Sequence, residues 1–468
     1  MKCFEVEFSE LATSESIRLS PPFILPTTNY KYDKISNYLA VCESGSRPKG
    51  GISNDDEGEA ISVGGEQINV DGSIDFSKIP YVSHEFYQNA KKGKVENLDI
   101  LICKDGALTG KTCLINFDDL PKKEVMVNEH VYVLRGNNEI NQKFLFYLTR
   151  SDLFQHQIRD LAYRKKAQPG LNSDHFKKVK IPAISKEIQD KIVAKIEPIE
   201  QTIKDLKSRI KKPQEVINKV FAREFGFDLE GFERSQLIKD YFVDLSDFAN
   251  NKDIRQSVKF HRPVGKFVLE ELNKITNKRI KDFILEPIVL GSGISPKDFD
   301  EAGDCGYVGM SNIKNWCLDK DSVISVSKSF EAENKKKTIA KNDILIARSG
   351  EGTIGKCALI EDGEINAIFA DFTMRIRLKN YNQRFAYYFF RTTYFQVLIE
   401  INKKGLGNNT NIFPSQIREF PIIDISLSHQ QKIVDEIKLE LDSQEQIKKQ
   451  IETERQKIDA IIEQVISS

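Results

Sequence analysis

The chain carries the same sequence pattern twice. Residues 17–26 (IRLSPPFILP) and 254–263 (IRQSVKFHRP) share Ile, Arg, Ser, Phe and Pro at identical spacing, 237 residues apart. Residues 99–102 (DILI) return as residues 343–346, at an offset of 244. A period this long excludes a solenoid, whose repeats span roughly 20–50 residues. The pattern therefore predicts a tandem pair of related domains that differ by small insertions in loops.

Charge is balanced overall but clustered locally. Lys plus Arg and Asp plus Glu each number 69 among 468 residues, so the net charge of zero argues against a uniformly basic polyanion binder. A single basic run usually covers a solvated face. However, Lys165-Lys166 and Lys403-Lys404 both precede a Gly/Asn-rich turn in equivalent loops. This recurrence indicates a binding role for both loops.

Cysteine usage and the amino-terminal residues indicate the compartment. The seven cysteines form no CxxC pair and no pattern with the six histidines, so we expect neither a zinc site nor a disulfide framework. Residues 1–7 (MKCFEVE) are charged, unlike a secretory signal, and no apolar stretch approaches the roughly 18 residues of a membrane helix. A reducing cytoplasm is the expected location.

Changes of hydrophobic period suggest the domain boundaries. Residues 1–185 and 226–425 both combine short β-rich runs with an aromatic helix, which predicts an α+β fold class with two tandem mixed α/β domains. Each domain is expected to close at an apolar-Pro step, Ile181-Pro182 or Phe420-Pro421. Residues 186–225 and 426–468 then follow with a helical period.

Isoleucines at alternating spacings of four and three in these two segments predict a coiled-coil seam. We expect the helices to pair within one molecule, preferably antiparallel, because this relates the two domains by an approximate two-fold. Pro198 should kink or delay the first helix and Pro213 should weaken its last turns. The predicted seam residues are Ile192, Ile196, Ile199, Ile203, Leu206 and Ile210 in the first helix, and Ile433, Ile437, Ile447, Ile451 and Ile458 in the second.

Two motifs resemble enzyme signatures without completing them. Residues 106–112 (GALTGKT) are one residue short of a phosphate-binding Walker A loop, and residues 350–357 (GEGTIGKC) place Cys357 where the magnesium-binding hydroxyl belongs. Residues 20–23 (SPPF) resemble the catalytic loop of amino-methyltransferases, but the duplicate at 257–260 (SVKF) lacks both prolines. We therefore expect no catalytic residues and no metal site on this chain.

The order of motifs resembles the specificity subunit of type I restriction-modification enzymes. The resemblance rests on the strand 343–346 followed by residues 349–356 (SGEGTIGK), and on the apolar-Pro steps that lead into QDKIV (189–193) and QQKIV (430–434). It covers nearly the whole chain. The family implies two target-recognition domains, each reading one half of a split DNA site, and helices that set the spacing. A helix of about 36 residues would be a rod of roughly 50 Å, long enough to hold two domains over separate grooves.

Under this resemblance, lysines, arginines and amides in the loops are the candidates for contacts with phosphates and bases. In the first copy these residues are Lys104, Lys111, Arg164, Lys165 and Lys166, and in the second they are Arg348, Lys356, Lys403, Lys404, Asn408 and Asn409.

The family also implies the partners. These are double-stranded DNA, two methyltransferase subunits docked on the helices, and restriction subunits that join through the complex, with S-adenosylmethionine, ATP and magnesium on those partner subunits. Three alternatives stay open at this point: a specificity subunit of a type IIB-like or other methyltransferase-linked defence system, a P-loop-like nucleotide-dependent enzyme, and a structural adaptor that does not touch DNA. The identity of the partners, ATP turnover and DNA binding would separate them.

Overall fold

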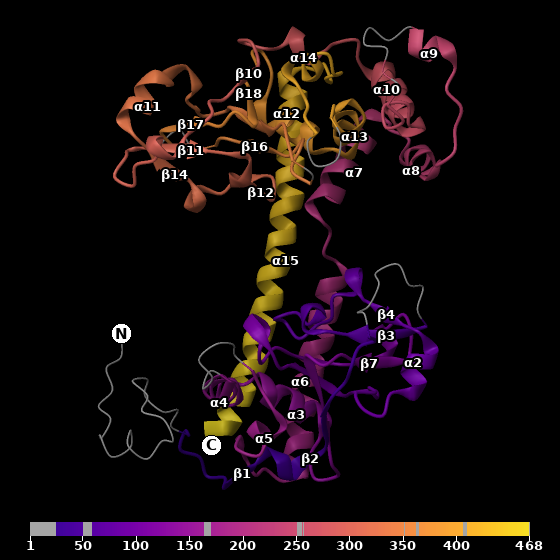
Figure 1. Ribbon diagram of the computed structural model, residues 1–468, viewed down its shortest axis with the longest axis vertical. Coiled ribbons are helices and arrows are strands. Elements are labelled where there is room, and N and C mark those ends of the chain that lie inside the picture. The colour runs from indigo at the N-terminus through magenta and orange to yellow at the C-terminus, as the bar shows by residue number, and fades with distance from the viewer. Residues whose placement is uncertain are drawn as a thin grey trace. The chain divides into compact units, whose positions relative to one another are not determined.

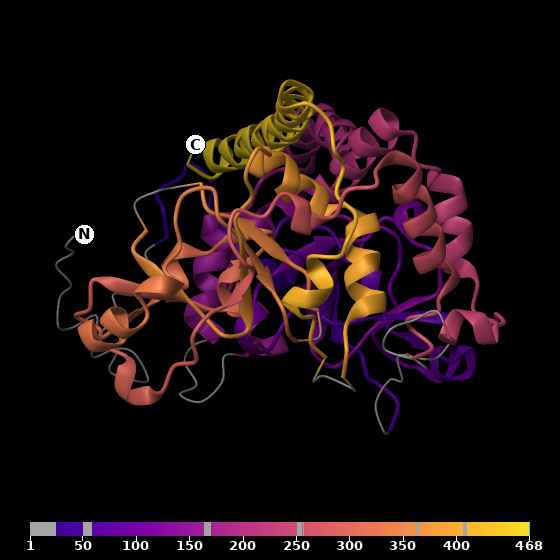
Figure 2. The same ribbon diagram turned by 90° about the horizontal axis from the view of Figure 1, so that it is seen from above.

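The computed structural model describes residues 25–49, 59–162, 170–249, 255, 257–350, 352–361, 365–405 and 410–467. The chain divides into two compact units (Figures 1 and 2). Unit 1 comprises Met1–Arg209 with Lys449–Ser468, and unit 2 comprises Ile210–Lys448. These units include parts of the long helices, so the boundaries expected at residues 185, 225 and 425 stay predictions.

Within its described residues, unit 1 has sheets of four, three and two strands, in the orders β2-β8-β5-β6, β4-β3-β7 and β1-β9. The four-stranded sheet is antiparallel throughout, whereas β3 and β7 are parallel. The strands are β1 (Tyr32–Lys34), β2 (Leu39–Ser44), β3 (Ala60–Val63), β4 (Tyr81–Val82), β5 (Ile100–Cys103), β6 (Thr112–Leu114), β7 (Val125–Val127), β8 (Val131–Gly136) and β9 (Lys180–Pro182).

Unit 2 repeats the four-stranded and three-stranded sheets of this plan. Its sheets have the orders β10-β18-β15-β16, β14-β11-β17 and β12-β13, again with one parallel pair, β11 and β17. The strands are β10 (Val289–Leu290), β11 (Cys305–Val308), β12 (Ile313–Lys314), β13 (Cys317–Leu318), β14 (Ile324–Val326), β15 (Ile344–Ala347), β16 (Cys357–Leu359), β17 (Ala367–Phe369) and β18 (Thr373–Ile376). The predicted fold class, two tandem mixed domains with long helices, is confirmed.

The helices that lie between and after the strands occur in the same chain order in both units, and the described part of unit 2 has four further helices before its first strand. Unit 1 contains α2 (His84–Asn89), α3 (Gln142–Arg150), α4 (Asp152–Ala162), α5 (Ser173–Phe176), α6 (Lys186–Ser208) and the end of α15 (Leu427–Ser467). Unit 2 contains α7 (Pro213–Phe225), α8 (Leu229–Leu237), α9 (Leu245–Ala249), α10 (Pro263–Ile275), α11 (Lys328–Glu333), α12 (Gln383–Arg391), α13 (Thr393–Asn402), α14 (Pro414–Ile417) and the start of α15.

Short 3₁₀ turns connect the larger elements. In unit 1 they are η1 (Ile35–Tyr38), η2 (Gly65–Gln67), η3 (Phe76–Lys78), η4 (Gly106–Leu108) and η5 (Phe117–Asp119). In unit 2 they are η6 (Ile280–Asp282), η7 (Pro296–Asp298), η8 (Met310–Asn312), η9 (Lys320–Ser322) and η10 (Lys335–Lys337).

A buried carboxylate explains why the DILI strand begins with aspartate in both copies. Asp99 accepts hydrogen bonds from Nε and Nη2 of Arg135, at 2.8 and 2.7 Å. Asp343 accepts the same pair from Arg377, at 2.6 and 2.9 Å. Both carboxylates are almost fully buried, and a bidentate arginine is the geometry that compensates their desolvation. Each pair joins the first residue before a central strand to the neighbouring strand, and so fixes the register of the sheet.

A buried glutamine explains the QxKIV motif. Gln189 Oε1 accepts the backbone N–H of Asn141 at 2.7 Å, and Gln430 Oε1 accepts that of Asn382 at 2.7 Å. The two asparagines are the N-caps of α3 and α12. The motif therefore ties the first turn of each long helix to the aromatic helix of its own unit, and both glutamines are buried because these bonds satisfy them.

The expectation of one helix over residues 186–225 is wrong. Two helices form, α6 ending at Ser208 and α7 starting at Pro213. Pro213 occupies the first turn of α7, where its missing N–H has no intrahelical acceptor to lose. Ile210 lies in the break and is exposed, so its assignment to the seam is corrected. Helix α6 continues through Pro198.

The remaining seam residues lie at least partly in the interior of their own units. Ile192, Ile196, Ile203, Leu206, Ile433, Ile437, Ile447 and Ile451 are buried, and Ile199 and Ile458 are partly buried. In unit 1 the end of α15 packs with α6 through Ile192, Ile196, Ile462 and Ile466, in the same core as α3 and α4. In unit 2 the start of α15 packs with α7 through Val220, Phe221, Ile433 and Ile437.

Polar contacts within unit 2 set the direction of this pairing. The backbone N–H of Lys211 donates to Gln444 Oε1 at 2.8 Å, and Arg223 pairs with Glu436 at 2.6 Å. His429 lies 3.4 Å from Glu224. As the residue numbers rise from Lys211 to Glu224, those of their partners in α15 fall from Gln444 to His429. The two segments are therefore antiparallel.

Candidate nucleic-acid interface

The candidate loops are built around a glycine hairpin, which we define as β5–β6 in unit 1 and β15–β16 in unit 2. The strands of each hairpin are antiparallel. Gly110 and Gly355 close the turns at φ +90° and +84°, a region that favours glycine. Their carbonyls accept hydrogen bonds from Gln155 and Gln396, at 2.9 and 3.0 Å. The turn is therefore held against α4 and α13.

This geometry accounts for the incomplete Walker motifs. A P-loop joins a strand to a helix whose N-terminus faces the phosphates. Here β15 continues into the antiparallel strand β16 instead. Cys357, at the position of the magnesium-binding hydroxyl, is fully buried, and burial raises the pKa of its thiol. The motif is a structural turn, which argues against a nucleotide site.

Four of the predicted lysines and arginines lie in the turns of the two glycine hairpins. Lys104 and Arg348 follow β5 and β15, and Lys111 and Lys356 precede β6 and β16. All four are partly exposed. The Lys104 ammonium lies 5.5 Å from the centre of the Tyr132 ring, and the Arg348 guanidinium lies 5.3 Å from that of Phe413. These aromatic faces orient the cations without neutralising them.

A second loop lies beside each hairpin. In unit 1 the backbone N–H of Leu171 donates to Lys104 O at 2.8 Å, and in unit 2 that of Ile412 donates to Arg348 O at 2.9 Å. The structure therefore brings the Gly-Lys turn of each unit next to the end of its Gly/Asn-rich segment. Arg164, Lys165, Lys166, Asn408 and Asn409 lie outside the described residues.

Lys403 does not suit the role predicted for it. Its side chain is 3% exposed and pairs with Glu400 at 2.7 Å, which leaves it no access to a phosphate. The reason is its place immediately after the last turn of α13, where Arg255 donates to its carbonyl at 2.9 Å. Lys404 is exposed, and its backbone pairs with Asn411 in both directions at 2.7 Å.

Arg255 also explains part of the sequence repeat at residues 254–263. Its guanidinium lies 4.6 Å from the ring centre of Phe260 and donates to the carbonyls of Asn402 and Lys403. The recurring Arg and Phe thus cap α13 in unit 2. The SPPF segment at residues 20–23 lies outside the described residues.

A groove of ≈ 1250 Å³ borders the hairpin of unit 1. It is lined by the hairpin turn, by η2 and by the residues around η3, and its polar side chains include Arg47, Asp105, Asn128 and His130. His130 Nδ1 lies 3.0 Å from Asp105 Oδ2, and both side chains are partly exposed. The sequence predictions missed Asp105 and His130, because neither belongs to a recognisable motif.

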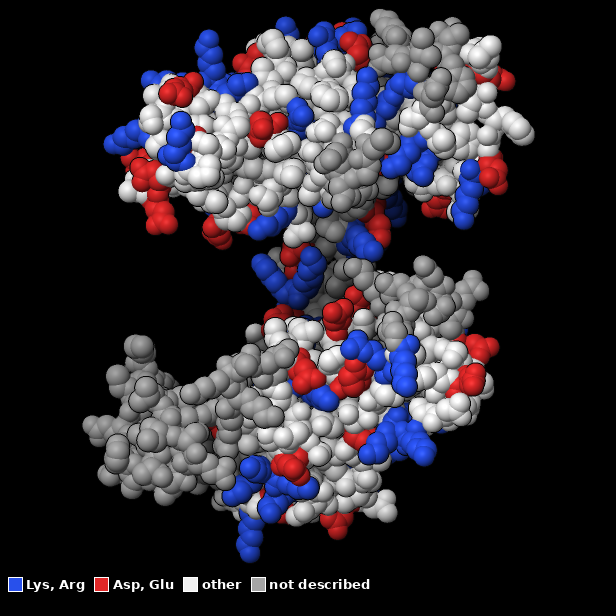
Figure 3. Space-filling view, in the orientation of Figure 1, with Lys and Arg blue, Asp and Glu red and all other residues white. Residues whose placement is uncertain are grey.

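The charge distribution matches the neutral composition. On the face in view in Figure 3, Lys and Arg side chains alternate with Asp and Glu over each unit, rather than merging into one basic field. Nucleic-acid binding by this chain would therefore depend on local cations in defined loops, with acidic side chains nearby.

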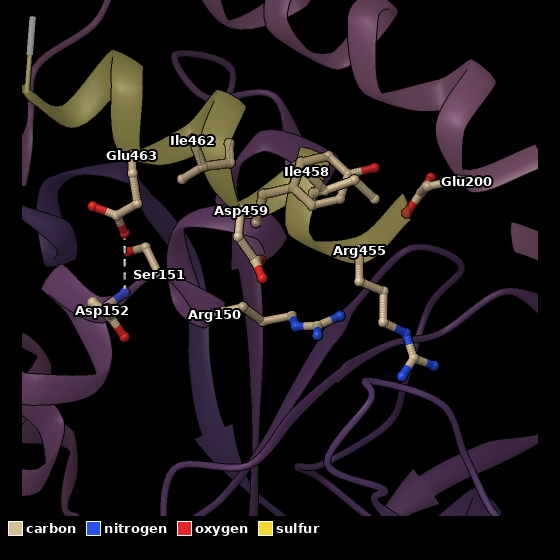
Figure 4. A pocket seen from close by; sticks show the side chains of 10 residues that line it. Arg150, Ser151, Asp152, Glu200, Arg455, Ile458, Asp459, Ile462 and Glu463 are labelled. Atoms are coloured by element: carbon tan, nitrogen blue, oxygen red, sulfur yellow. Dashed lines mark hydrogen bonds between the residues drawn. The ribbon is translucent and has the colours of Figure 1, made fainter. Parts of the chain in front are cut away.

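A polar cavity of ≈ 210 Å³ lies where α3, α6 and the end of α15 meet in unit 1 (Figure 4). Glu463 of α15 accepts the backbone N–H of Asp152 at 3.3 Å. Burial raises the pKa of Asp459 despite the opposing field of Arg150, whose own pKa burial lowers. The cavity belongs to the packing of the long helix.

The loop at residues 69–73 contacts the same region of unit 1 through Asp71. The Asp71 carboxylate accepts hydrogen bonds from Arg455 at 2.7 Å and Lys207 at 3.1 Å, and its carbonyl accepts one from Arg150 at 3.1 Å. Burial would raise the pKa of Asp71, but bonds from Ser73 and the Lys207 charge outweigh it and hold the pKa well below its usual value. The contacts of Asp71 with Lys207 of α6 and Arg455 of α15 connect the sheet region of unit 1 to both of its long helices.

Among the described residues, no group of three or more His, Cys, Asp or Glu side chains is placed to hold a metal ion. In the same part of the chain, no helix combines the length and apolarity needed to cross a membrane.

Comparisons with known proteins agree with the duplicated architecture. A family profile described as "Type I restriction modification DNA specificity domain" matches residues 49–215 and again residues 267–456. No curated protein matches the chain significantly. One solved chain, from a study of complex assembly and conformational transition of the type I R-M system, superposes with a TM-score of 0.51. It is 13% identical, over 95% of this chain and 99% of its own length, and shows the shared fold.

Two crystal structures align less closely. The S subunit of a type I restriction-modification system from M. genitalium gives a TM-score of 0.42 at 14% identity, over 94% of this chain and 99% of its own. The HsdS subunit from Thermoanaerobacter tengcongensis gives 0.35 at 13% identity, over 96% and 98%. The family profile covers most of the chain in two copies, so this protein belongs to the type I restriction-modification DNA specificity family, as a DNA-recognition subunit.

Proposed function

We propose that each unit reads one half of a bipartite, asymmetric DNA site. The observation that carries this proposal is the repetition of one framework with different side chains. Both units have the same strand order in their four-stranded and three-stranded sheets, the same glycine hairpin and the same adjacent loop. A duplicated framework with identical reading surfaces would suit a symmetric site, whereas divergent surfaces suit two different half-sites.

Cations around the hairpins anchor the DNA backbone in this proposal. Lys104, Lys111, Arg348, Lys356 and the exposed Lys404 are the described candidates for phosphate contacts. Such contacts fix register and orientation and carry no sequence information directly. Sequence discrimination then falls to polar and apolar side chains in the loops between these cations.

The long helices set the distance between the half-sites and dock two methyltransferase subunits, through which restriction subunits join. The chain itself is non-catalytic, and S-adenosylmethionine, ATP and magnesium bind to the partner subunits. A type IIB-like or other methyltransferase-linked assembly is the alternative, which the identity of co-purifying subunits would decide.

A module exchange tests the proposal. Residues 1–185 are replaced by the equivalent segment of a relative, and the chimera is expressed with its methyltransferase subunits. Mapping of methylated bases across the host genome should show one changed half-site, with the other half and the spacer retained. A swap that alters both halves together, or neither, would contradict independent reading. Control assays of the purified chain alone should show no ATP turnover.

A further inference from the structure

Two pairs of positions, 105 with 130 and 349 with 372, are equivalent in the two units. The backbone N–H of Lys104 donates to His130 O at 2.9 Å, and that of Arg348 donates to Phe372 O at 2.9 Å. Asp105 and Ser349 are the next residues along the chain. Both also face the second loop, through β-bridges of Asp105 to Gly170 and of Ser349 to Asn411. The backbone frame around the four positions is therefore the same.

The side chains at these positions have opposite character. In unit 1, Asp105 and His130 form a polar pair at 3.0 Å, with 33% and 45% of their side chains exposed, on the wall of the groove. In unit 2, Ser349 is buried, and Phe372 is 46% exposed. If these positions served only the fold, both units should carry similar side chains there. Different side chains on the same backbone are expected where the two copies recognise different partners.

Neither arrangement is explained by folding. Asp105 places a carboxylate one residue from Lys104, where it repels the phosphates that the lysine would attract. Phe372 leaves an aromatic ring in water beside Arg348, at a loss of burial energy. Both are accounted for if they meet base edges, since a carboxylate accepts from an exocyclic amino group and an apolar ring contacts the thymine methyl.

We infer that Asp105 is the specificity-determining residue of unit 1 and accepts a hydrogen bond from the exocyclic amino group of cytosine or adenine in the major groove. His130 is a positioning residue, because its ring holds the Asp105 carboxylate at the groove wall. Phe372 occupies the corresponding position in unit 2 and selects thymine through its methyl group. This inference rests on the proposed reading of half-sites by separate units.

The test uses the full chain assembled with its methyltransferase subunits. The variants are Asp105→Ala, His130→Gln and the double change Asp105→Ser with His130→Phe, which copies unit 2. Glu187→Ala is the matched control, which removes a carboxylate at an exposed position in the first turn of α6, paired with Lys191. Binding to a randomised duplex library and thermal unfolding are measured for each assembly.

Asp105→Ala should lower discrimination about 10-fold to 100-fold at one base pair of one half-site, the range for loss of one base contact. His130→Gln should weaken discrimination at the same base pair, without moving the unfolding temperature as a merely structural residue would. Duplexes carrying unsubstituted purine for adenine, or pyrimidin-2-one for cytosine, remove the amino group and identify its source. The wild-type assembly should lose affinity for one analogue, and the Asp105→Ala assembly, which has no acceptor at this position, should not distinguish it from the natural base.

An Asp105→Ala assembly that keeps every base preference, or loses affinity uniformly, would overturn the assignment. This failure is distinguishable from failure of the proposed function. If the exchange of residues 1–185 still changes one half-site while Asp105→Ala changes none, only the residue assignment is wrong. If the module exchange itself changes both halves or neither, the proposal of independent reading is wrong as well.

Discussion

Asp71 shows how one side chain couples a sheet region to the long helices of unit 1. It meets Arg455 and Lys207 through its carboxylate and Arg150 through its carbonyl. Asp71→Asn should keep the shape but remove the charge, at a cost of about 1–2 kcal/mol after allowance for partial exposure. Because the folded-state pKa is lowered, this contribution is present above the unfolded pKa and lost as pH falls through the folded value.

The melting temperatures of wild type and Asp71→Asn should therefore differ most at neutral pH and converge below about pH 4. Unfolding followed by circular dichroism across this range measures the difference. Lys191→Met, which breaks an exposed pair with Glu187, is the control and should show almost no pH-dependent difference. A constant gap between the Asp71→Asn and wild-type curves down to pH 2 would contradict the electrostatic account.

Burial separates two lysines that look alike in sequence. Lys356→Ala should weaken binding to all DNA sequences and reduce the slope of log affinity against log salt by about 1, as loss of one phosphate contact does. Lys403→Ala should leave that slope unchanged and instead lower stability, because Lys403 is buried against Glu400. Titrations at several salt concentrations, with melting curves for both variants, distinguish the outcomes. A reduced slope for Lys403→Ala would restore its predicted role at the phosphates.

Among the helices and strands, those that belong to a repeated sequence pattern could be predicted from the sequence. The strands at 100–103 and 344–347, the aromatic helices and the long apolar stripes were all expected from period and recurrence. The glycine turns were recognised, but their hairpin geometry required the pairing of β15 with β16. The break at residues 209–212 was missed because the isoleucine stripe continues across it, while Pro213 permits a new helix to start. Asp105 and His130 were missed because they are far apart in the sequence and come together only in the fold. The hydrogen bond from the backbone N–H of Lys104 to His130 O brings the two positions together.

The end of α15 is an integral part of the core of unit 1. Ile462 and Ile466 are almost fully buried and share a cluster with Ile196 of α6 and Phe144 of α3. Ile462→Asn should cost about 3–5 kcal/mol, since it removes a large aliphatic group and buries an amide without a partner. Chemical denaturation measures the loss. The exposed Gln456→Asn is the control on the same helix and should change stability by less than about 0.5 kcal/mol.

For the whole molecule, the proposal makes helix length the determinant of spacing between half-sites. One heptad is inserted into α15 after Lys448, at the division between the units, with a second heptad in the break at residues 209–212. Seven residues add about 10 Å of helix and keep the isoleucine stripe in phase. The spacer of the methylated motif should lengthen by up to about three base pairs, at 3.4 Å per pair, with both half-site sequences unchanged.

The matched control inserts seven residues into the exposed turn at residues 300–304 of unit 2, which adds length without adding helix. Its motif should be identical to that of the wild type. A double insertion that assembles with the methyltransferase subunits and methylates the original spacer would show that the helices do not set the distance. A change in half-site sequence would show instead that the reading surfaces depend on the helices. The expected result assigns spacing and reading to different parts of the chain, because an insertion in a helix translates a unit without altering the loops that contact bases.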